Sequence, residues 1–184
     1  EGGVFSFFNL DADSNDLINA DYILGIPIVY RHNSFATRFR IYHQSSHLGD
    51  EFVLSNPGVK RINLSYEGLE LTSSYEFSNF RTYLGGSAIV RSEPDLDPFQ
   101  LLAGAELRIP ESFFSLDTIL AAHLSAAEQS GWDVNQSYLI GPSIGNYNGR
   151  ELRFMLEYFK GISPNGQFFI DRVEYYGAGL FFDY

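Results

Sequence analysis

Alternation of apolar and polar residues with a period of two is the feature that most constrains this chain. The clearest example is the run Glu151-Leu152-Arg153-Phe154-Met155-Leu156-Glu157-Tyr158. Successive side chains of a β-strand point to opposite faces, so this run predicts a strand with one apolar and one charged face. A helix would mix the two sets on every face, which makes a helix the poorer interpretation.

The same alternation recurs along the whole chain and predicts about ten antiparallel strands, the last over residues 173–184. Each strand has an apolar face, formed by Tyr22, Leu24, Ile26, Ile28 and Tyr30; Phe35, Phe39 and Ile41; Phe80, Leu84, Ala88 and Val90; Leu101, Ala103, Ala105, Leu107 and Ile109; Leu116, Leu120, Ala122 and Leu124. The opposite faces carry arginines and carboxylates, so positive and negative charges occur there in similar number.

The span over residues 61–77 requires a change of phase. Ile62, Leu64 and Tyr66 set one apolar register, and the apolar residues from Leu69 onward set the other. A β-bulge at Glu67-Gly68 would reconcile the two registers. This interpretation places Asn63 and Glu67 on the polar face of their strand.

The connections between the predicted strands alternate in length. The short ones cover residues 32–34, 78–79, 111–114 and 145–149, whereas the long and mostly acidic ones cover residues 11–20, 46–59, 92–98, 128–133 and 161–172. Short turns at one rim and long loops at the other are typical of outer-membrane β-barrels.

Composition excludes several classes of protein. Apolar residues make up 45% of the 184 residues, yet no run approaches the roughly 18 apolar residues that a membrane helix needs. The chain has no cysteine, which excludes thiol catalysis, and a net charge of −11 at pH 7 argues against binding nucleic acid.

Two arrangements of the faces remain open, a soluble lipocalin-like barrel with an apolar interior and a membrane barrel with an apolar exterior. Lysine is rare, at positions 60 and 160, and strand ends carry the aromatic residues Tyr22, Tyr30, Phe35, Phe80, Tyr158, Tyr176 and Tyr184. These features favour an all-β, antiparallel, transmembrane up-and-down β-barrel as a single domain over residues 1–184. Because residues 3–8 already read as a strand, we expect the chain to be truncated at its amino end.

The alternating terminal residues Leu180, Phe182 and Tyr184 resemble the carboxy-terminal signal of outer-membrane barrels. That resemblance implies a Gram-negative outer membrane and recognition of Tyr184 by the barrel assembly machinery. The segments at residues 15–22, 42–51 and 163–169 resemble an uncharacterised bacterial family catalogued as a domain of unknown function. Members of that family are longer at the amino end, which could bring the complete barrel to twelve strands. The family name implies no activity.

We therefore expect an integral outer-membrane protein with a structural, surface or small-solute permeability role, in contact with outer-membrane lipids and lipopolysaccharide. The competing class is an enzyme. His43 and Ser45 share one face of a strand and continue the phase of Phe35, Phe39 and Ile41. This pair resembles the His-x-Ser of outer-membrane phospholipase A and lipid A deacylase, which implies Ser45 as nucleophile and His43 as base.

The group that would orient His43 is less clear from the sequence. Asn63 is the candidate we favour and Glu67 is the other, although the predicted alternation turns both toward the interior. Ser46-His47 follows Ser45 where the phospholipase has Ser-Asn-Gly. The competing interpretation is a polar rim segment with a purely structural role.

A divalent metal ion, Ca²⁺ among them, is a third hypothesis for this region. His47 shares the phase of His43, and Asp50 and Glu51 follow closely, so His47, Asp50 and Glu51 could bind a metal or bridge lipopolysaccharide. The acidic clusters Asp11-Asp13-Asp16 and Glu93-Asp95-Asp97 could also collect Ca²⁺, or they could simply keep the loops solvated.

Overall fold

The computed structural model describes residues 1–12, 15–145 and 149–183, and it contains one antiparallel sheet whose ten strands follow one another in chain order. The strands are β1 (Gly2–Asn9), β2 (Asp16–His32), β3 (Phe35–Leu48), β4 (Leu64–Phe77), β5 (Phe80–Glu93), β6 (Phe99–Phe113), β7 (Leu116–Ala127), β8 (Val134–Gly145), β9 (Glu151–Ile162) and β10 (Arg172–Asp183). The predicted all-β class, strand number and up-and-down order are confirmed.

Three short helices lie in the long connections: α1 (Asp50–Ser55), η1 (Glu128–Ser130) and η2 (Gly166–Phe168). None of the helices in the described part of the chain is long and apolar enough to cross a membrane.

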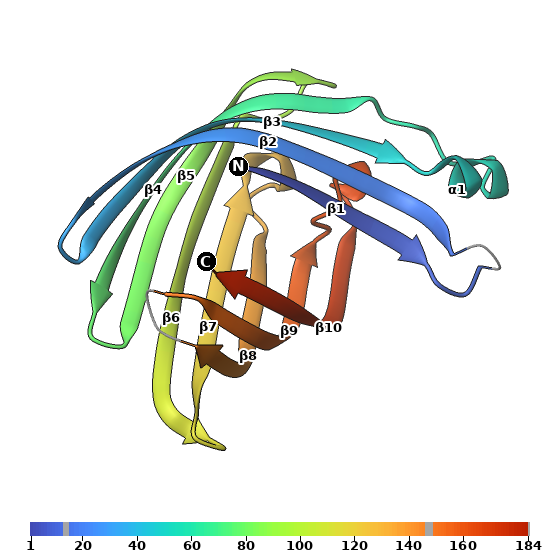
Figure 1. Ribbon diagram of the computed structural model, residues 1–184. Helices are drawn as coiled ribbons and strands as arrows, with labels where there is room; N and C mark the ends of the chain where they lie inside the picture. Colours follow the sequence, from blue (N-terminus) through green and yellow to red (C-terminus); the bar gives the residue numbers. More distant parts are fainter. Residues whose placement is uncertain (13–14, 146–148, 184) are drawn as a thin grey trace.

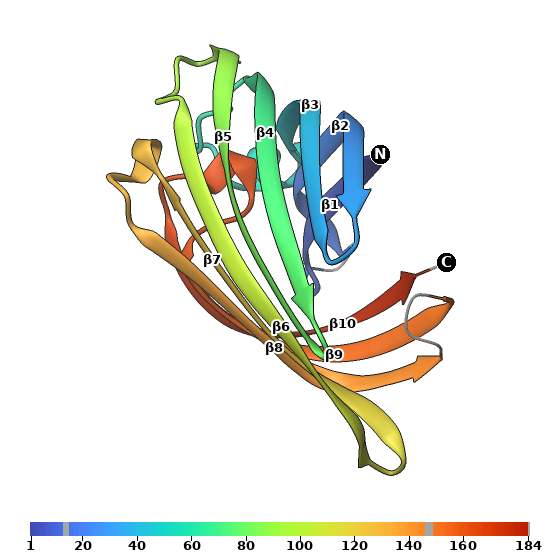
Figure 2. The same ribbon diagram turned by 90° about the vertical axis from the view of Figure 1, so that its left-hand side faces the viewer.

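The sheet curls strongly into a half-barrel with a deep concave side (Figures 1 and 2). In the described part of the chain β1 pairs with β2 and β10 pairs with β9, so that β1 and β10 form the two edges of the sheet. The two edge strands lie on opposite sides of the opening in Figure 1. Curling of this kind follows from the right-handed twist of long antiparallel strands.

The described connections alternate in length as predicted, whereas residues 13–14 and 146–148, within the predicted connections 11–20 and 145–149, lie outside the described residues. The tight turns at Asn33-Ser34, Ser78-Asn79 and Phe114-Ser115 lie at one rim, and the long loops that hold α1, η1 and η2 lie at the other. Asn33 and Ser78 each adopt a positive φ, near 51° and 52°, which suits two-residue hairpin turns. Boundaries differ by a few residues: β2 begins at Asp16, inside the loop predicted over residues 11–20.

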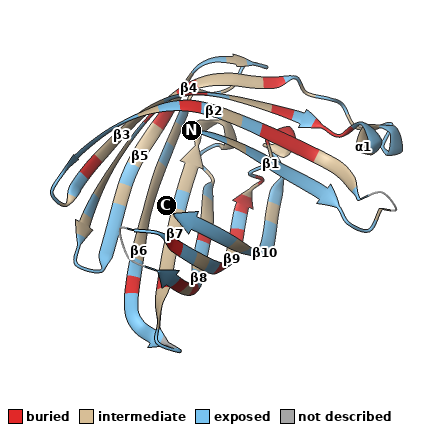
Figure 3. Ribbon diagram, in the orientation of Figure 1, coloured by how far each residue is buried: buried red, intermediate tan, exposed pale blue. Residues whose placement is uncertain are grey.

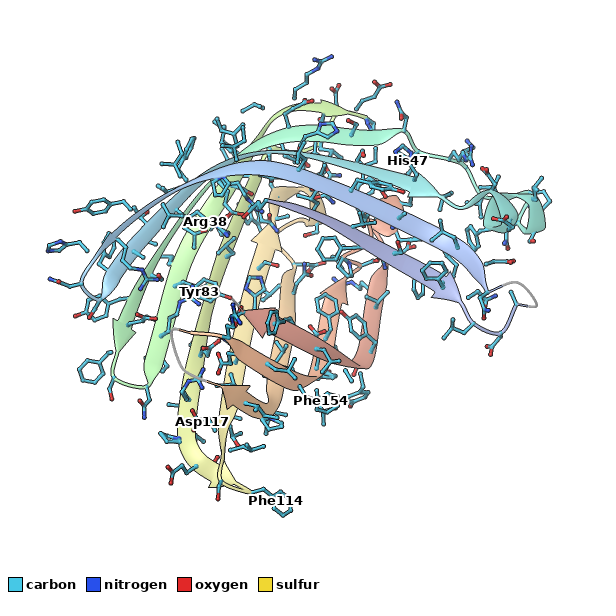
Figure 4. All side chains as sticks on the ribbon, in the orientation of Figure 1. Arg38, His47, Tyr83, Phe114, Asp117 and Phe154 are labelled. Atoms are coloured by element: carbon cyan, nitrogen blue, oxygen red, sulfur yellow. The ribbon has the colours of Figure 1, made fainter. Side chains whose placement is uncertain are left out.

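The two faces of the sheet differ as the alternation predicts. On the outer face, aliphatic side chains such as Leu24 and Ile26 are exposed by 69% and 71%. On the concave face, Arg108 of β6 pairs with Glu151 of β9 at 2.6 Å, although β7 and β8 lie between these strands. Such a contact can form only across the hollow of the sheet. Figure 4 shows Arg38 and Tyr83 directed toward that hollow, whereas Phe154 lies on the outside.

The loop between β9 and β10 closes over the concave side at the long-loop rim. The Gly166 amide donates to Asp21 Oδ2 at 3.0 Å, and the Gln167 side-chain amide donates to the carbonyls of Ser46 and Ile62, both at 2.8 Å. Asn19, Asp21 and Ser46 are almost fully buried beneath this loop, and Figure 3 shows buried segments on β2 and β3. We call residues 163–171 the plug loop.

Candidate functional site

The candidate site lies on the outer face of β3 near the long-loop rim. Ile41 and His43 are exposed on this face, and Ser45 follows in the same phase, whereas the intervening Tyr42 and the following Ser46 are buried on the concave side. This placement agrees with the facing expected from the alternation. Tyr22 of β2 lies opposite Ser45, and Leu24 lies opposite His43.

The structure corrects the predicted facing of the side chains of β4. The strand runs from Leu64 to Phe77 without the predicted change of phase. Leu64 is buried with 2% exposure, and the Tyr66 hydroxyl donates to Gln44 Oε1 at 2.7 Å on the concave side. The register irregularity does fall at Glu67/Gly68, but the extra residue is Val90 on β5. The prediction that Leu64 and Tyr66 face outward, and Glu67 inward, is therefore wrong.

The physical reason for this error lies in the plug loop. A Cβ added to Gly166 would lie 2.8 Å from Leu64 Cδ2, so the loop packs directly against the inward-facing end of β4. At this rim the concave side is thus filled by Leu64, by loop backbone and by the buried polar side chains of Asn19, Asp21 and Ser46. The rule that apolar residues face outward does not hold where a loop closes the interior.

The corrected register places Glu67 beside His43 on the outer face. The two residues are Cα partners across β3 and β4, and His43 Nδ1 lies 3.2 Å from Glu67 Oε1. An ionised carboxylate only accepts hydrogen bonds, so Nδ1 is the donor and Nε2 is left for another partner. Both side chains keep more than two-fifths of their surface exposed. We call His43, Ser45 and Glu67 the outer-face cluster.

Ser45 lies two residues along β3 from His43. At a rise of about 3.3 Å per residue their Cα atoms are about 6.6 Å apart, a span that an imidazole and a hydroxyl can bridge. In the described part of the chain the Ser45 hydroxyl makes no side-chain hydrogen bond. The structure thus brings the imidazole of His43 and the carboxylate of Glu67 into contact, and leaves the Ser45 hydroxyl without a side-chain partner on the same face.

Two grooves flank the outer-face cluster. On the β1 side an apolar groove of about 530 Å³ is lined by Gly2, Gly3, Val4, Tyr22, Leu24 and His43. On the β5 side a polar groove of about 500 Å³ is lined by Ser45, His47, Asn63, Ser65, Glu67 and Arg91, among others. Asn63, the favoured orienting residue from the sequence, lines the polar groove, but the carboxylate in contact with His43 is Glu67.

The three residues considered for a metal do not converge. His47 packs against Tyr22 with ring centroids 6.0 Å apart, Asp50 pairs with Arg61, and Glu51 is exposed in α1. Among the residues that the structure describes, no group of three histidines, aspartates or glutamates is placed to hold a metal ion. Asp13, which belongs to an acidic cluster, and the terminal Tyr184 lie outside the described residues.

The concave side holds a network of ions whose partners sequence reasoning did not identify. Arg108 contacts Asp117 at 2.9 Å and Glu151 at 2.6 Å, and Arg153 contacts Glu106 at 3.2 Å as well as Glu151. A second group joins Arg38 and Arg40 to Glu70, at 2.7 Å and 2.5 Å. Alternation indicated that these residues face inward, but only the curl of the sheet brings β6 close enough to β9.

Comparisons with known proteins place the chain in a family without assigning it an activity. Residues 1–184 match the family described as "Protein of unknown function (DUF1207)". No curated protein matches the chain, and no solved structure matches it either.

Proposed function

Because the chain belongs to the DUF1207 family, whose function is unknown, we propose its function from its geometry: it is an integral β-barrel protein of the bacterial outer membrane, with a structural role and an interior closed to wide diffusion. The observation that carries the proposal is the distribution of side chains between the two faces of the sheet. Apolar residues cover the outside, and paired ions cover the inside.

The outer face supports contact with lipid. A soluble protein rarely exposes a continuous apolar surface larger than a few hundred Å². Here exposed aliphatic side chains run along the outer face of successive strands, including Leu24, Ile26, Ile28, Ile41, Leu71, Leu84, Leu101, Ile140, Leu156 and Leu180. Hydrocarbon would cover this surface without cost, whereas water would not.

Aromatic residues border the aliphatic surface at both rims. Near the long-loop rim the rings of Tyr138, Tyr158 and Tyr176 form a row across β8, β9 and β10, with centroids 6.4 Å and 5.2 Å apart. Near the short-turn rim Tyr30 and Phe35 are exposed on β2 and β3. Two such belts are the pattern expected where a barrel meets the two membrane–water interfaces.

The interior favours a structural role and disfavours an open channel. Ion pairs join strands across the hollow, and the plug loop covers its long-loop end. A closed sheet also satisfies every backbone group, which hydrocarbon requires, so the proposal includes closure of the two free edges in the membrane. Planar-bilayer recordings of inserted protein should therefore lack the large steady conductance of a general porin.

A matched pair of substitutions tests the membrane placement. Leu156 on β9 and Leu54 on α1 are both exposed, by 52% and 80%, but only Leu156 lies in the apolar surface of the sheet. Leu156→Arg should cost about 2–4 kcal/mol near the membrane midplane and reduce heat-modifiable, protease-resistant protein in vesicles, and Leu54→Arg should not. Equal tolerance of both changes would contradict lipid contact.

A second candidate function is hydrolysis of a lipid at the membrane surface. The observation that favours it is the contact between His43 and Glu67, which supplies a catalytic base with an orienting carboxylate. Release of fatty acid by the inserted protein, lost on Ser45→Ala, would test it.

A further inference from the structure

We infer that the outer-face cluster cleaves a carboxylic ester of a phosphate-bearing membrane lipid, with an acyl chain in the apolar groove and the polar head in the polar groove. The inference rests on the proposed membrane placement, because only an inserted sheet presents this face to lipid. Ser45 would act as nucleophile, His43 as base, and Glu67 as the residue that positions His43.

The contact between His43 and Glu67 carries the first step. In the Glu67–His43 hydrogen bond of 3.2 Å the Nδ1 proton is held by a carboxylate, which selects the tautomer with an unprotonated Nε2. A carboxylate in this position also stabilises the imidazolium that forms when the base accepts a proton.

The location of Ser45 carries the second step. Its partner on the neighbouring strand β2 is Tyr22, an exposed aromatic residue toward the long-loop end of that strand. The partner of His43 on β2 is Leu24, which belongs to the aliphatic surface. The outer-face cluster therefore lies at the boundary between the aliphatic surface and the polar rim. In a lipid bilayer this is the depth at which the acyl esters join the chains to the polar heads.

The two grooves indicate the chemical class of the substrate. The apolar groove beside His43 borders the exposed Val4 and Leu24, and it suits an acyl chain. The polar groove beyond Ser45 is lined by Arg91 together with the carboxylates of Glu67 and Glu93, and Arg91 is exposed and forms no ion pair in the described part of the chain. Arginine binds phosphate well, so a lipid with phosphate next to its acyl ester fits both grooves. Glycerophospholipids and lipid A share this chemistry.

The reaction balances with water as the only co-reactant. Ser45 Oγ attacks the ester carbonyl carbon while His43 Nε2 takes the hydroxyl proton, and the resulting intermediate collapses as His43 returns that proton to the leaving alcohol. Water then attacks the acyl-Ser45 ester, and His43 transfers a proton from water to Ser45 Oγ. The products are a fatty acid and the deacylated lipid, with Ser45 restored.

The experiment uses the folded chain in vesicles of phosphatidylglycerol, with and without lipid A, and measures fatty acid release. Insertion is first verified by heat-modifiable mobility, so that failure to insert is separated from failure to hydrolyse. Ser45→Ala should lower the rate by about 100-fold or more, and Ser55→Ala is the control, since Ser55 is an exposed serine of α1 that lines neither groove. A fluorophosphonate probe should label wild type and the Ser55 variant, but not Ser45→Ala.

Glu67→Gln distinguishes a positioning role from a structural one. It should lower kcat about 100-fold and alter the pH profile of the rate while KM and insertion remain close to wild type, because the amide cannot stabilise the imidazolium. Arg91→Gln should instead raise KM for the phosphate-bearing lipid. Inserted wild-type protein that neither releases fatty acid from either vesicle nor reacts with the probe would overturn the inference and leave the proposed membrane placement intact. Equal losses in the Ser45 and Ser55 variants would also overturn it.

Discussion

The hydroxyl of Tyr83 on β5 lies 2.7 Å from Nδ1 of His123 on β7, and thus spans the intervening strand β6. Gly104 is the residue that lies between them, because it is the Cα partner of both Tyr83 and His123. The tyrosine ring passes over the glycine on the concave side, where a side chain would occupy the same space. This arrangement fixes the register of three neighbouring strands.

Gly104→Ala should destabilise the protein. A Cβ at this position would lie 2.3 Å from Tyr83 Cζ and 2.7 Å from the Ala122 carbonyl oxygen, so both a ring and a backbone would have to move. We expect a loss of about 1–3 kcal/mol in the free energy of unfolding, measured by urea denaturation of the folded protein in vesicles. Gly177→Ala is the control, because its nearest neighbour would be 3.7 Å away; an equal loss there would refute the explanation.

Arg108 and Glu151 should show energetic coupling. Their side chains are 7% and 4% exposed and lie 2.6 Å apart across the hollow of the sheet. Arg108→Met or Glu151→Leu alone should cost about 1.5–3 kcal/mol, since each leaves charged groups on the concave side with fewer partners. The double variant should cost less than the sum, as measured in a double-mutant cycle by urea unfolding. Strict additivity would show that the pair does not interact.

Gln167→Ala should loosen the plug loop. Its amide donates to the Ser46 and Ile62 carbonyls, and its Oε1 accepts from the Ile62 amide at 3.2 Å, so one side chain ties the plug loop to two other segments. We expect faster proteolytic cleavage within residues 163–171 and a higher single-channel conductance. The control is Asn165→Ala, which removes an amide in the same loop that forms no side-chain bond in the described residues. Unchanged cleavage in Gln167→Ala would contradict this role.

Trp132 provides a direct probe of insertion. It is the single tryptophan of the chain, and it lies on the outer face beside Phe99 and Leu101 at the long-loop rim. On incorporation into vesicles its emission should shift to the blue, and lipids brominated near the head group should quench it more than lipids brominated near the chain ends. The control combines Trp132→Phe with Leu54→Trp, which moves the probe to α1. Solvent-like emission from Trp132 in inserted protein would argue against a membrane belt at this rim.

Most of the fold could be predicted from local pattern, but the outer-face cluster could not be completed in that way. The alternation around Leu156 correctly indicated which residues point outward, and it placed His43 and Ser45 together on β3. It failed at Leu64, Tyr66 and Glu67, because the plug loop covers the concave side at that rim and buries the inward-facing Leu64 against it. The sequence therefore predicts the wrong face for Glu67, the carboxylate that contacts His43.

The sequence by itself determined the strands, which side chains of each strand share a face, and the alternation of short and long connections. Side-chain direction along a strand is a local property, so the pattern of a single segment reveals it. Tertiary structure alone decided which residues meet, as with Arg108 and Glu151, and Tyr83 and His123. These contacts depend on the curl of the sheet and on the register between strands. Neither is encoded in the period of a single segment, because both arise from packing among segments far apart in the chain.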